Sequence, residues 1–375
     1  MKNRVCVYAI TKNESKFVDR WVDSMSEADA IVVLDTGSTD DTVEKLRARG
    51  VTVAVKEIKP WRFDVARNEA MKLVPKDCNI LFSTDLDEVL EPGWGDALRA
   101  GWIDGKHTRG MYKYVWSHLP TGEPARTFMY NKIHTREWKW LYPVHELLIS
   151  EKTGSGNYPY EEQLNLFDSV TLHHYPDPTK SRGSYLPLLE QREREYPNDM
   201  FGLIYLAHEY NYRGMPDKSN EKLKKVLDVF KDQISPVEEA SCYLFMGDNY
   251  SKEDRDDDAI SSYMNGIKAE PTYRECYMNL AKEYIKLSRY QEAVDCVKEG
   301  LRSSVRHYTW LERDTSWSYE PYDLLCLAYY YGGHKLKSIG CAYKALSFAP
   351  KDQRLIDNAR ICLDSLSDLD IVEDC

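Results

Sequence analysis

Three short polar segments stand in a fixed order in the first quarter of the chain, and each follows an apolar run typical of a buried β-strand. They are residues 10–14, 35–40 and 85–88. Stretches with helical spacing separate them, so strand and helix alternate. This alternation predicts a parallel sheet whose strands would carry all three segments to one edge. We therefore expect an α/β domain that binds a phosphorylated ligand at that edge.

The sequence pattern changes twice farther along the chain. Between residues 110 and 175, short aromatic-rich strands alternate with polar loops, which suits a mixed-sheet extension. From residue 184 onward the sequence is helical, and Ala259 recurs as Ala293 at the 34-residue period of tetratricopeptide helical pairs. We expect an α/β domain over 1–180, a helical linker over 181–199, an all-α repeat domain over 200–363 and an acidic tail over 364–375.

Composition narrows the classes of function. The formal net charge is −11, whereas binding to nucleic acid needs clustered Lys and Arg side chains, so nucleic acid is disfavoured as a partner. The nine Cys residues form no CxxC pair, which favours reduced thiols in the cytoplasm. No apolar run approaches the roughly 20 residues of a membrane span. We expect a cytoplasmic protein with no membrane span.

The acidic segment 85–88 carries the predicted chemistry. Asp85 and Asp87 stand two positions apart at a strand end, so their carboxylates lie on the same side of an extended backbone. Both can reach one hard cation that bridges a diphosphate, and such a cation neutralises the diphosphate as it leaves. Acidic turns are also common on solvated loops. The position after a strand and two further polar loops favours the functional interpretation.

Four blocks in order resemble the family 2 glycosyltransferases of the GT-A fold: residues 11–14, 35–40, 66–70 and 85–88. The resemblance spans the expected α/β domain and implies a UDP-sugar donor with Mg²⁺ or Mn²⁺. By resemblance, the metal ligands would be Asp87 and His174. The donor-binding residues would be Thr11, Asn13, Glu14, Asp35, Asp40, Arg67, Asn68 and Asp85. Structural alternatives are a helix cap for Asp40 and a turn for Asn13.

Two later blocks extend this resemblance. Residues 138–146 resemble the W…HE segment of these enzymes, and residues 172–175 resemble their closing strand, whose His reaches the metal or diphosphate. Side chains alternate across a strand, so only one of His173 and His174 can face the site, and His174 aligns better. A structural role for this His is the alternative. Lys180 and Arg182 could contact donor phosphates or be solvated.

Inverting transfer needs a group that takes the acceptor proton. The candidates are Glu146, His145 and Glu88, and the alternative for Glu146 is an ion pair that orders its loop. Trp138, Trp140 and Tyr142 would share a strand face and serve either core packing or a sugar platform. An aromatic insertion over 310–319 could close a dimer, grip a ligand or pack against the α/β domain.

The domain order resembles the sublancin-type peptide S-glycosyltransferases. This resemblance implies a peptide or protein acceptor and a homodimer through the repeat domain. The leading interpretation is an inverting, metal-assisted glycosyltransferase that moves a sugar from a UDP-sugar to a peptide or protein side chain. One alternative is the same reaction on a glycan, lipid-linked or nucleobase acceptor. The other is a noncatalytic repeat scaffold with a relic transferase domain.

Overall fold

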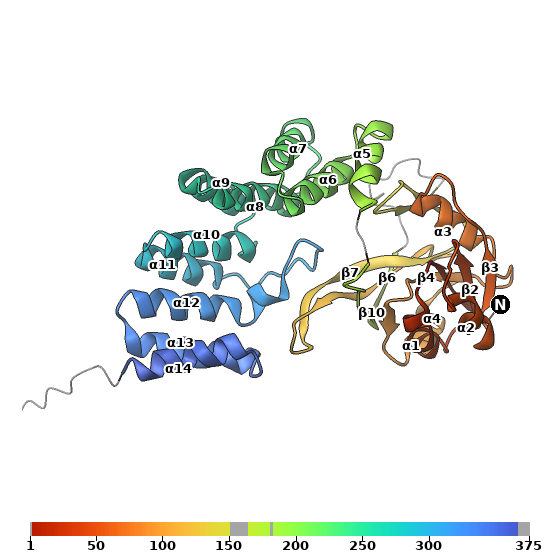
Figure 1. Cartoon of the computed structure of the whole chain (residues 1–375), viewed down its shortest axis with the longest axis horizontal. Coiled ribbons are helices and arrows are strands. Elements are labelled where there is room, and N and C mark those ends of the chain that lie inside the picture. The colour runs from red at the N-terminus through yellow and green to blue at the C-terminus, as the bar shows by residue number, and fades with distance from the viewer. Residues whose placement is uncertain (1, 151–163, 181–182, 367–375) are drawn as a thin grey trace, which may run out of the picture. The chain divides into compact units, whose positions relative to one another are not determined.

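The computed structural model describes residues 2–150, 164–180 and 183–366. The chain divides into two compact units: Met1–Ser117 with Phe128–Gly202, and His118–Thr127 with Leu203–Cys375. The first unit is an α/β domain, and the second is built from helices (Figure 1). This arrangement confirms the predicted fold class. In the described part of the chain, no helix is both long and apolar enough to cross a bilayer.

Eight described strands of the first unit form one large sheet with the order β3-β2-β1-β4-β7-β6-β10-β5. Parallel pairing joins β3 to β2, β2 to β1 and β1 to β4, and the register sets Thr11 opposite Asp35. The expected polar segments therefore emerge at one edge of this sheet. The strands are β1 (Val5–Thr11), β2 (Ala30–Asp35), β3 (Thr52–Val55), β4 (Ile80–Ser83), β5 (Glu88–Leu90), β6 (Arg109–His118), β7 (Pro124–His134) and β10 (Leu164–His174).

The second half of the sheet is mixed. Strand β7 runs antiparallel to β4, β10 runs parallel to β6, and β5 runs antiparallel to β10. A separate antiparallel ribbon is formed by β8 (Trp138–Leu141) and β9 (Leu147–Ser150). The helices of this unit are η1 (Ser15–Phe17), α1 (Val18–Ser24), α2 (Thr42–Ala48), α3 (Phe63–Met71), α4 (Trp94–Gly101) and α5 (Tyr185–Glu195).

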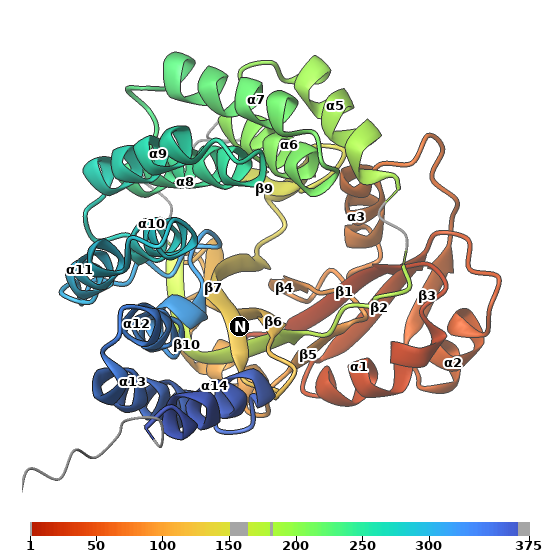
Figure 2. The ribbon, with the colours of Figure 1, turned by 60° about the vertical axis from the view of Figure 1, so that its left-hand side comes forward.

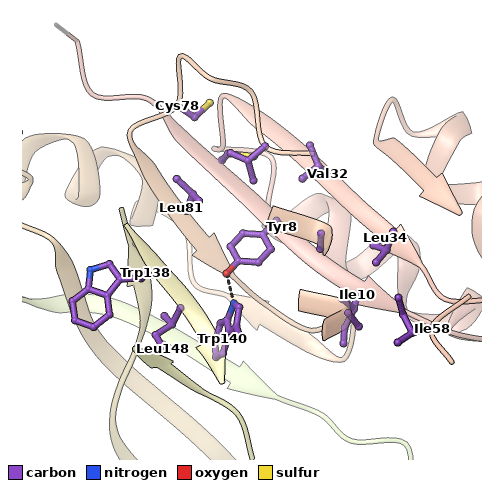
Figure 3. Close-up of a cluster of buried hydrophobic side chains, with 14 residues drawn as sticks. Tyr8, Ile10, Val32, Leu34, Ile58, Cys78, Leu81, Trp138, Trp140 and Leu148 are labelled. Atoms are coloured by element: carbon purple, nitrogen blue, oxygen red, sulfur yellow. Dashed lines mark hydrogen bonds between the residues drawn. The ribbon is translucent and has the colours of Figure 1, made fainter. Parts of the chain in front are cut away.

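A buried cluster joins β1, β2 and β4 to helix α3 and the β8–β9 ribbon (Figure 3). Trp138 and Trp140 belong to this cluster, and Trp140 Nε1 donates a hydrogen bond to Tyr8 Oη at 2.7 Å. Trp138 and Trp140 are therefore core residues. Of the two roles considered for them, core packing and a sugar platform, the structure shows core packing. Leu81 and Leu148 pack in the same cluster.

The hydrogen bond from Trp140 continues into a buried histidine. His134 Nε2 lies 2.7 Å from Tyr8 Oη, and His134 Nδ1 lies 2.8 Å from the carbonyl oxygen of Thr135. A carbonyl oxygen only accepts, so Nδ1 carries the proton and Nε2 accepts from Tyr8. Every polar atom of this chain of hydrogen bonds is satisfied with a neutral imidazole. Burial lowers the pKa of His134 to about 3.

The second unit stacks helices in antiparallel pairs. Ala293, a position marked by the repeat, is fully buried in one cluster with Ala281 and with Ala328 of the next pair. Figure 2 shows α8, α10 and α12 along one side of the array and α9, α11 and α13 along the other. The helices are α6 (Met200–Tyr212), α7 (Pro216–Val229), α8 (Pro236–Lys252), α9 (Asp256–Ala269), α10 (Arg274–Lys286), α11 (Tyr290–Gly300), α12 (Glu320–Tyr331), α13 (Lys335–Phe348) and α14 (Gln353–Asp364).

Two short segments complete the helical unit. The tip of the β6–β7 hairpin, His118–Thr127, groups with the helices, and Thr127 donates its hydroxyl to Asp314 at 2.6 Å. Asp314 begins η2 (Asp314–Trp317), a short helix in the aromatic insertion between α11 and α12. The hairpin tip was not anticipated from the sequence. Helix α14 ends at Asp364, and most of the predicted acidic tail lies outside the described residues.

Acid should weaken the α/β unit through His134. Between about pH 6.5 and pH 3 the unfolded chain binds a proton that the folded state excludes, so stability falls as the pH is lowered. The expected loss is about 1.4 kcal/mol of unfolding free energy per pH unit below 6.5. Urea unfolding at pH 7, 6 and 5 measures it, and the His134→Gln variant should lose this part of the slope. Equal slopes in the two proteins would refute the assignment.

Close packing of α8 against α9 should make substitution of Gly247 destabilising. A Cβ added at Gly247 in α8 would lie 2.4 Å from the Tyr263 ring in α9, so Gly247→Ala should lower the unfolding free energy by about 1–3 kcal/mol. Gly340 in α13 has no neighbour within 4 Å of such a Cβ. Gly340→Ala should therefore be neutral or stabilise by up to about 1 kcal/mol. Thermal unfolding of the two variants compares them directly.

Candidate active site

Hydrogen bonds tie the first two predicted donor loops together. The Thr11 hydroxyl donates to Glu14 Oε2 at 2.9 Å. The backbone N–H of Asn13 donates to Ser38 Oγ at 2.8 Å, and Asn13 Oδ1 accepts from the N–H of Thr39 at 2.7 Å. Asn13 takes a left-handed conformation with φ of 55°, which Asn tolerates well. The loops after β1 and β2 thus form one connected surface.

Asp35 and Asp40, the two predicted donor-binding acids of the second loop, accept hydrogen bonds from backbone N–H groups near them in the chain. Asp35 is fully buried, and its Oδ1 accepts from the N–H groups of Gly37 and Ser38, both at 2.9 Å. Asp40 Oδ1 accepts from the N–H of Thr42 at 3.1 Å, at the start of α2. Both carboxylates shape the loop. The donor-binding roles predicted for them stay predictions.

Arg67 on α3 is the centre of the site. It is buried, its Nη2 lies 2.8 Å from Asp85 Oδ1, and its Nε pairs with Glu146. Its Nη1 donates to Ser83 Oγ at 3.1 Å, and its guanidinium carbon lies 5.2 Å from the centroid of the Trp140 ring. Three predicted site residues from distant parts of the chain therefore meet in one ion network.

Asn68, the neighbour of Arg67, pairs with backbone. Its Nδ2 donates to the carbonyl oxygen of Trp140 at 2.8 Å, and its Oδ1 accepts from the N–H of Trp140 at 2.9 Å. The side chain therefore fastens the β8–β9 ribbon to α3. Contact with a donor sugar or diphosphate stays a prediction for this residue.

Lys132 on β7 belongs to the network and was missed from the sequence. Its side chain is 7% exposed, and its Nζ lies 3.2 Å from Asp85 Oδ2 and 3.4 Å from Glu88 Oε1. Glu88 is fully buried, accepts from Tyr114 Oη at 2.8 Å, and accepts from the N–H of Asp85 at 2.8 Å. The available signal was a single charged residue within the aromatic-rich strand 128–133.

The two buried cations set the charge of the acids between them. Burial opposes ionisation of Asp85, but Arg67 and Lys132 outweigh it and hold the pKa of Asp85 well below its usual range. Burial raises the pKa of Glu88, Lys132 opposes the rise, and the charges of Asp85 and Asp87 add to it. Asp85 is therefore an ionised acid already saturated by protein cations.

Asp87 lies beside His174, the pair predicted to hold a metal. His174 Nε2 is 3.4 Å from Asp87 Oδ2, and its Nδ1 is 2.9 Å from the carbonyl oxygen of Trp116. Burial lowers the pKa of His174, but the hydrogen bond and charge of Asp87 outweigh it and raise the pKa. His173 instead lies 2.9 Å from Glu91 Oε1. The two histidines face different partners, as strand alternation predicts.

The first loop faces the same acids. Glu14 is buried and pairs with Lys180, which follows β10. Burial raises the pKa of Glu14, Lys180 opposes the rise, and the charge of Asp87 adds to it. Burial lowers the pKa of Lys180, but the charge and hydrogen bond of Glu14, followed by the charges of Asp87 and Asp85, outweigh it and raise the pKa. Glu14 and Lys180 form an ion pair, and the charge of Asp87 acts on both of them. Arg182 lies outside the described residues.

The three candidate bases differ in access. Glu88 is sealed in the network with both carboxylate oxygens hydrogen-bonded. Glu146 pairs with Arg67 and keeps 10% of its side chain exposed. His145 adopts φ of 48°, and its ring centroid lies 5.8 Å from that of Tyr185. Geometry alone leaves the catalytic role of each as a prediction.

Asp87 and His174 fit a hard divalent ion that is shared with a substrate. Within the described residues, no group of three or more His, Cys, Asp or Glu side chains is arranged to hold a metal. Mg²⁺ usually takes one or two protein ligands and completes its shell with phosphate oxygens and water. The Nδ1–H bond to the Trp116 carbonyl leaves Nε2 to act as a ligand. The residues present therefore fit such an ion.

Comparison with known proteins supports one family for the N-terminal part. Residues 6–144 match the model of glycosyl transferase family 2. An uncharacterized glycosyltransferase of Rickettsia conorii is 31% identical over 142 residues, covering 35% of this chain and 47% of that protein. One of Rickettsia bellii is 28% identical over 136 residues, covering 35% of this chain and 45% of that protein. The chain spans just under half the length of these relatives.

The helical part is similar to solved repeat proteins. A thermophilic TPR protein of Thermus thermophilus covers 48% of this chain and 90% of its own, at 19% identity and a TM-score of 0.37. The MamA protein covers 46% of this chain and 87% of its own, at 20% identity and a TM-score of 0.36.

Removing Arg67 should expose the cost of the buried network. Arg67→Met leaves Asp85 and Glu146 without their shared partner, so unfolding free energy should fall by about 3–5 kcal/mol. Arg49, which pairs with Asp19 and Asp23 on the surface, is the control. Arg49→Met should leave the unfolding free energy nearly unchanged, because exposed ion pairs are screened by solvent. Urea unfolding of both variants tests the contrast, and similar losses would contradict it.

Proposed function

We propose that this chain is an inverting glycosyltransferase that moves a sugar from a UDP-sugar to a peptide or protein side chain, assisted by Mg²⁺ or Mn²⁺. The match of residues 6–144 to glycosyl transferase family 2 supports glycosyl transfer. One observation in the fold carries the proposal further. Three separate segments interact at one edge of the sheet: Arg67 pairs with Asp85, and the charge of Asp87, in the same segment as Asp85, acts on Glu14.

The proposed roles follow from charge and access. Asp87 and His174 would hold the divalent ion, which supplies positive charge to the departing diphosphate. Lys180, whose side chain is half exposed, adds a cation on the same side, paired with Glu14 until a phosphate competes for it. Asp85 does not compete for the ion, since Arg67 and Lys132 already neutralise it. The site therefore gathers positive charge where a diphosphate leaves.

Glu146 is our candidate for the acceptor's proton. Glu88 is excluded from contact with an acceptor in this arrangement because it is fully buried and both its oxygens are hydrogen-bonded. Glu146 retains exposure and is oriented by Arg67, the same side chain that holds Asp85. His145, the preceding residue, is the alternative base. A matched pair of Glu146→Gln and His145→Gln variants distinguishes them by their loss of turnover.

The acceptor is proposed to be a polypeptide because stacked helical pairs commonly present surfaces for peptides. The insertion before α12 packs against helices α6 and α10. Trp310 packs its ring 5.1 Å from that of Tyr205, Arg313 Nη2 donates to Asn279 at 2.9 Å, and the Arg313 N–H donates to Glu275 at 2.8 Å. A peptide acceptor therefore needs a surface other than the one covered by these residues. Dimerisation through the repeats is part of the same proposal.

A noncatalytic scaffold is the competing function. Its α/β unit would have no need to bury Arg67 and Lys132 with three carboxylates, an arrangement that costs desolvation energy. The same reaction on a glycan, lipid-linked or nucleobase acceptor is the second competitor. Incubation of the purified chain with a panel of UDP-sugars and Mn²⁺, with UDP release as readout, separates enzyme from scaffold. Mass spectrometry of added acceptors then separates the acceptor classes.

Loss of Asp87 should abolish the metal-dependent reaction. We expect Asp87→Ala to reduce UDP release at least about a hundredfold, because the leaving diphosphate loses the group that holds its cation. Asp96→Ala is the control, since the Asp96 side chain is almost fully exposed on α4. That variant should match the wild type. Unchanged UDP release by Asp87→Ala would remove the metal assignment.

A further inference from the structure

The acidic segment after β4 contains two carboxylates, Asp85 and Asp87, that have different ion-pair partners. Asp85 Oδ1 lies 2.8 Å from Arg67 Nη2, and Asp85 Oδ2 lies 3.1 Å from the same nitrogen and 3.2 Å from Lys132 Nζ. Asp87 has neither cation as a neighbour at ion-pair distance and faces His174 instead. The chemical difference between the two acids is therefore set by residues outside the segment.

Lys132 is the part of this arrangement that has no proposed contact with the donor, the acceptor or the ion. Its ammonium is buried under the segment, on strand β7, and it contacts Asp85 and Glu88 together. The ring of Tyr130 lies 5.1 Å from Nζ and covers another side of it. A buried ammonium of this kind does not reach an acceptor. It can act only through the carboxylates that it holds.

Glu88 transmits the effect of Lys132 to the backbone. One oxygen of Glu88 contacts Lys132 and accepts from Tyr114, and the other accepts from the N–H of Asp85. The carbonyl oxygen of Asp87 accepts from the N–H of Tyr175, next to His174. The segment is thus fixed at both ends, and Lys132 holds the end that carries Asp85.

We propose that Lys132 is a positioning residue that withdraws Asp85 from metal binding, so that Asp87 is the single carboxylate this segment offers to a divalent ion. The inference rests on the proposed function. It assigns a role to a residue of β7 that neither the motif blocks nor the family match identifies. Lys132 lowers the charge that the segment presents and keeps the ion weakly held by protein, so that the donor diphosphate supplies further ligands.

The test compares metal affinity with turnover, because a merely structural role would lower both. In Lys132→Met, Mn²⁺ affinity without donor, measured by the electron spin resonance of free Mn²⁺, should rise about tenfold as Asp85 becomes available. UDP release should fall at least tenfold. Lys132→Arg should stay close to the wild type in both. Lys113→Met, which removes an exposed Lys from the adjacent strand β6, should change neither more than twofold.

A second variant separates released ligand from changed charge. Lys132→Met with Glu88→Gln removes the ammonium and one of its two carboxylates, so the network keeps its net charge and is expected to fold. Mn²⁺ affinity should still rise several-fold, since Asp85 has lost one cation. Unchanged or lower Mn²⁺ affinity in this variant would overturn the inference. If the wild type itself neither binds Mn²⁺ nor releases UDP, the proposed function fails instead, and with it the role built on it.

Discussion

The buried ion network around Arg67 is the interaction on which the site depends. Arg67 is the one side chain that contacts both the acidic segment after β4 and the loop after β8, through Asp85 and Glu146, among the contacts described above. A planar guanidinium can serve two carboxylates at once because its donors point in fixed, separate directions. Without it, two anions would share a buried space. Arg67 therefore fixes the acidic segment and the loop after β8 to one another.

The sheet and the edge at which the predicted site residues gather could be predicted from the sequence. Both follow from residue patterns that are local in the chain. The alternation of strands and helices placed the ends of β1, β2 and β4 at one edge. Strand alternation predicted that only one of His173 and His174 faces the site, and the family resemblance chose His174, which lies beside Asp87. These features depend on spacing within a few residues. They survive folding because side-chain direction follows strand geometry.

What the sequence missed arises from contacts between distant segments. The place of Lys132 in the ion network could not be predicted, because its partners lie 44 and 47 residues away in the chain, in the segment that follows a different strand. The grouping of the hairpin tip with the helices has the same origin, since Thr127 meets Asp314 across 187 residues. The donor contacts of Asp35, Asp40 and Asn68 stay predictions. Their side chains form hydrogen bonds within the loop after β2 and with the β8–β9 ribbon.

The amide of Asn68 has a consequence beyond the site. By accepting from the N–H and donating to the carbonyl of Trp140, it reproduces what a neighbouring peptide group would offer to the outer edge of β8. Among the described strands, β8 pairs only with β9 in its small ribbon, so this edge would otherwise present free backbone to any extended chain nearby. A single side chain thus satisfies the outward N–H and carbonyl of Trp140 and occupies the place where another strand would pair with this residue.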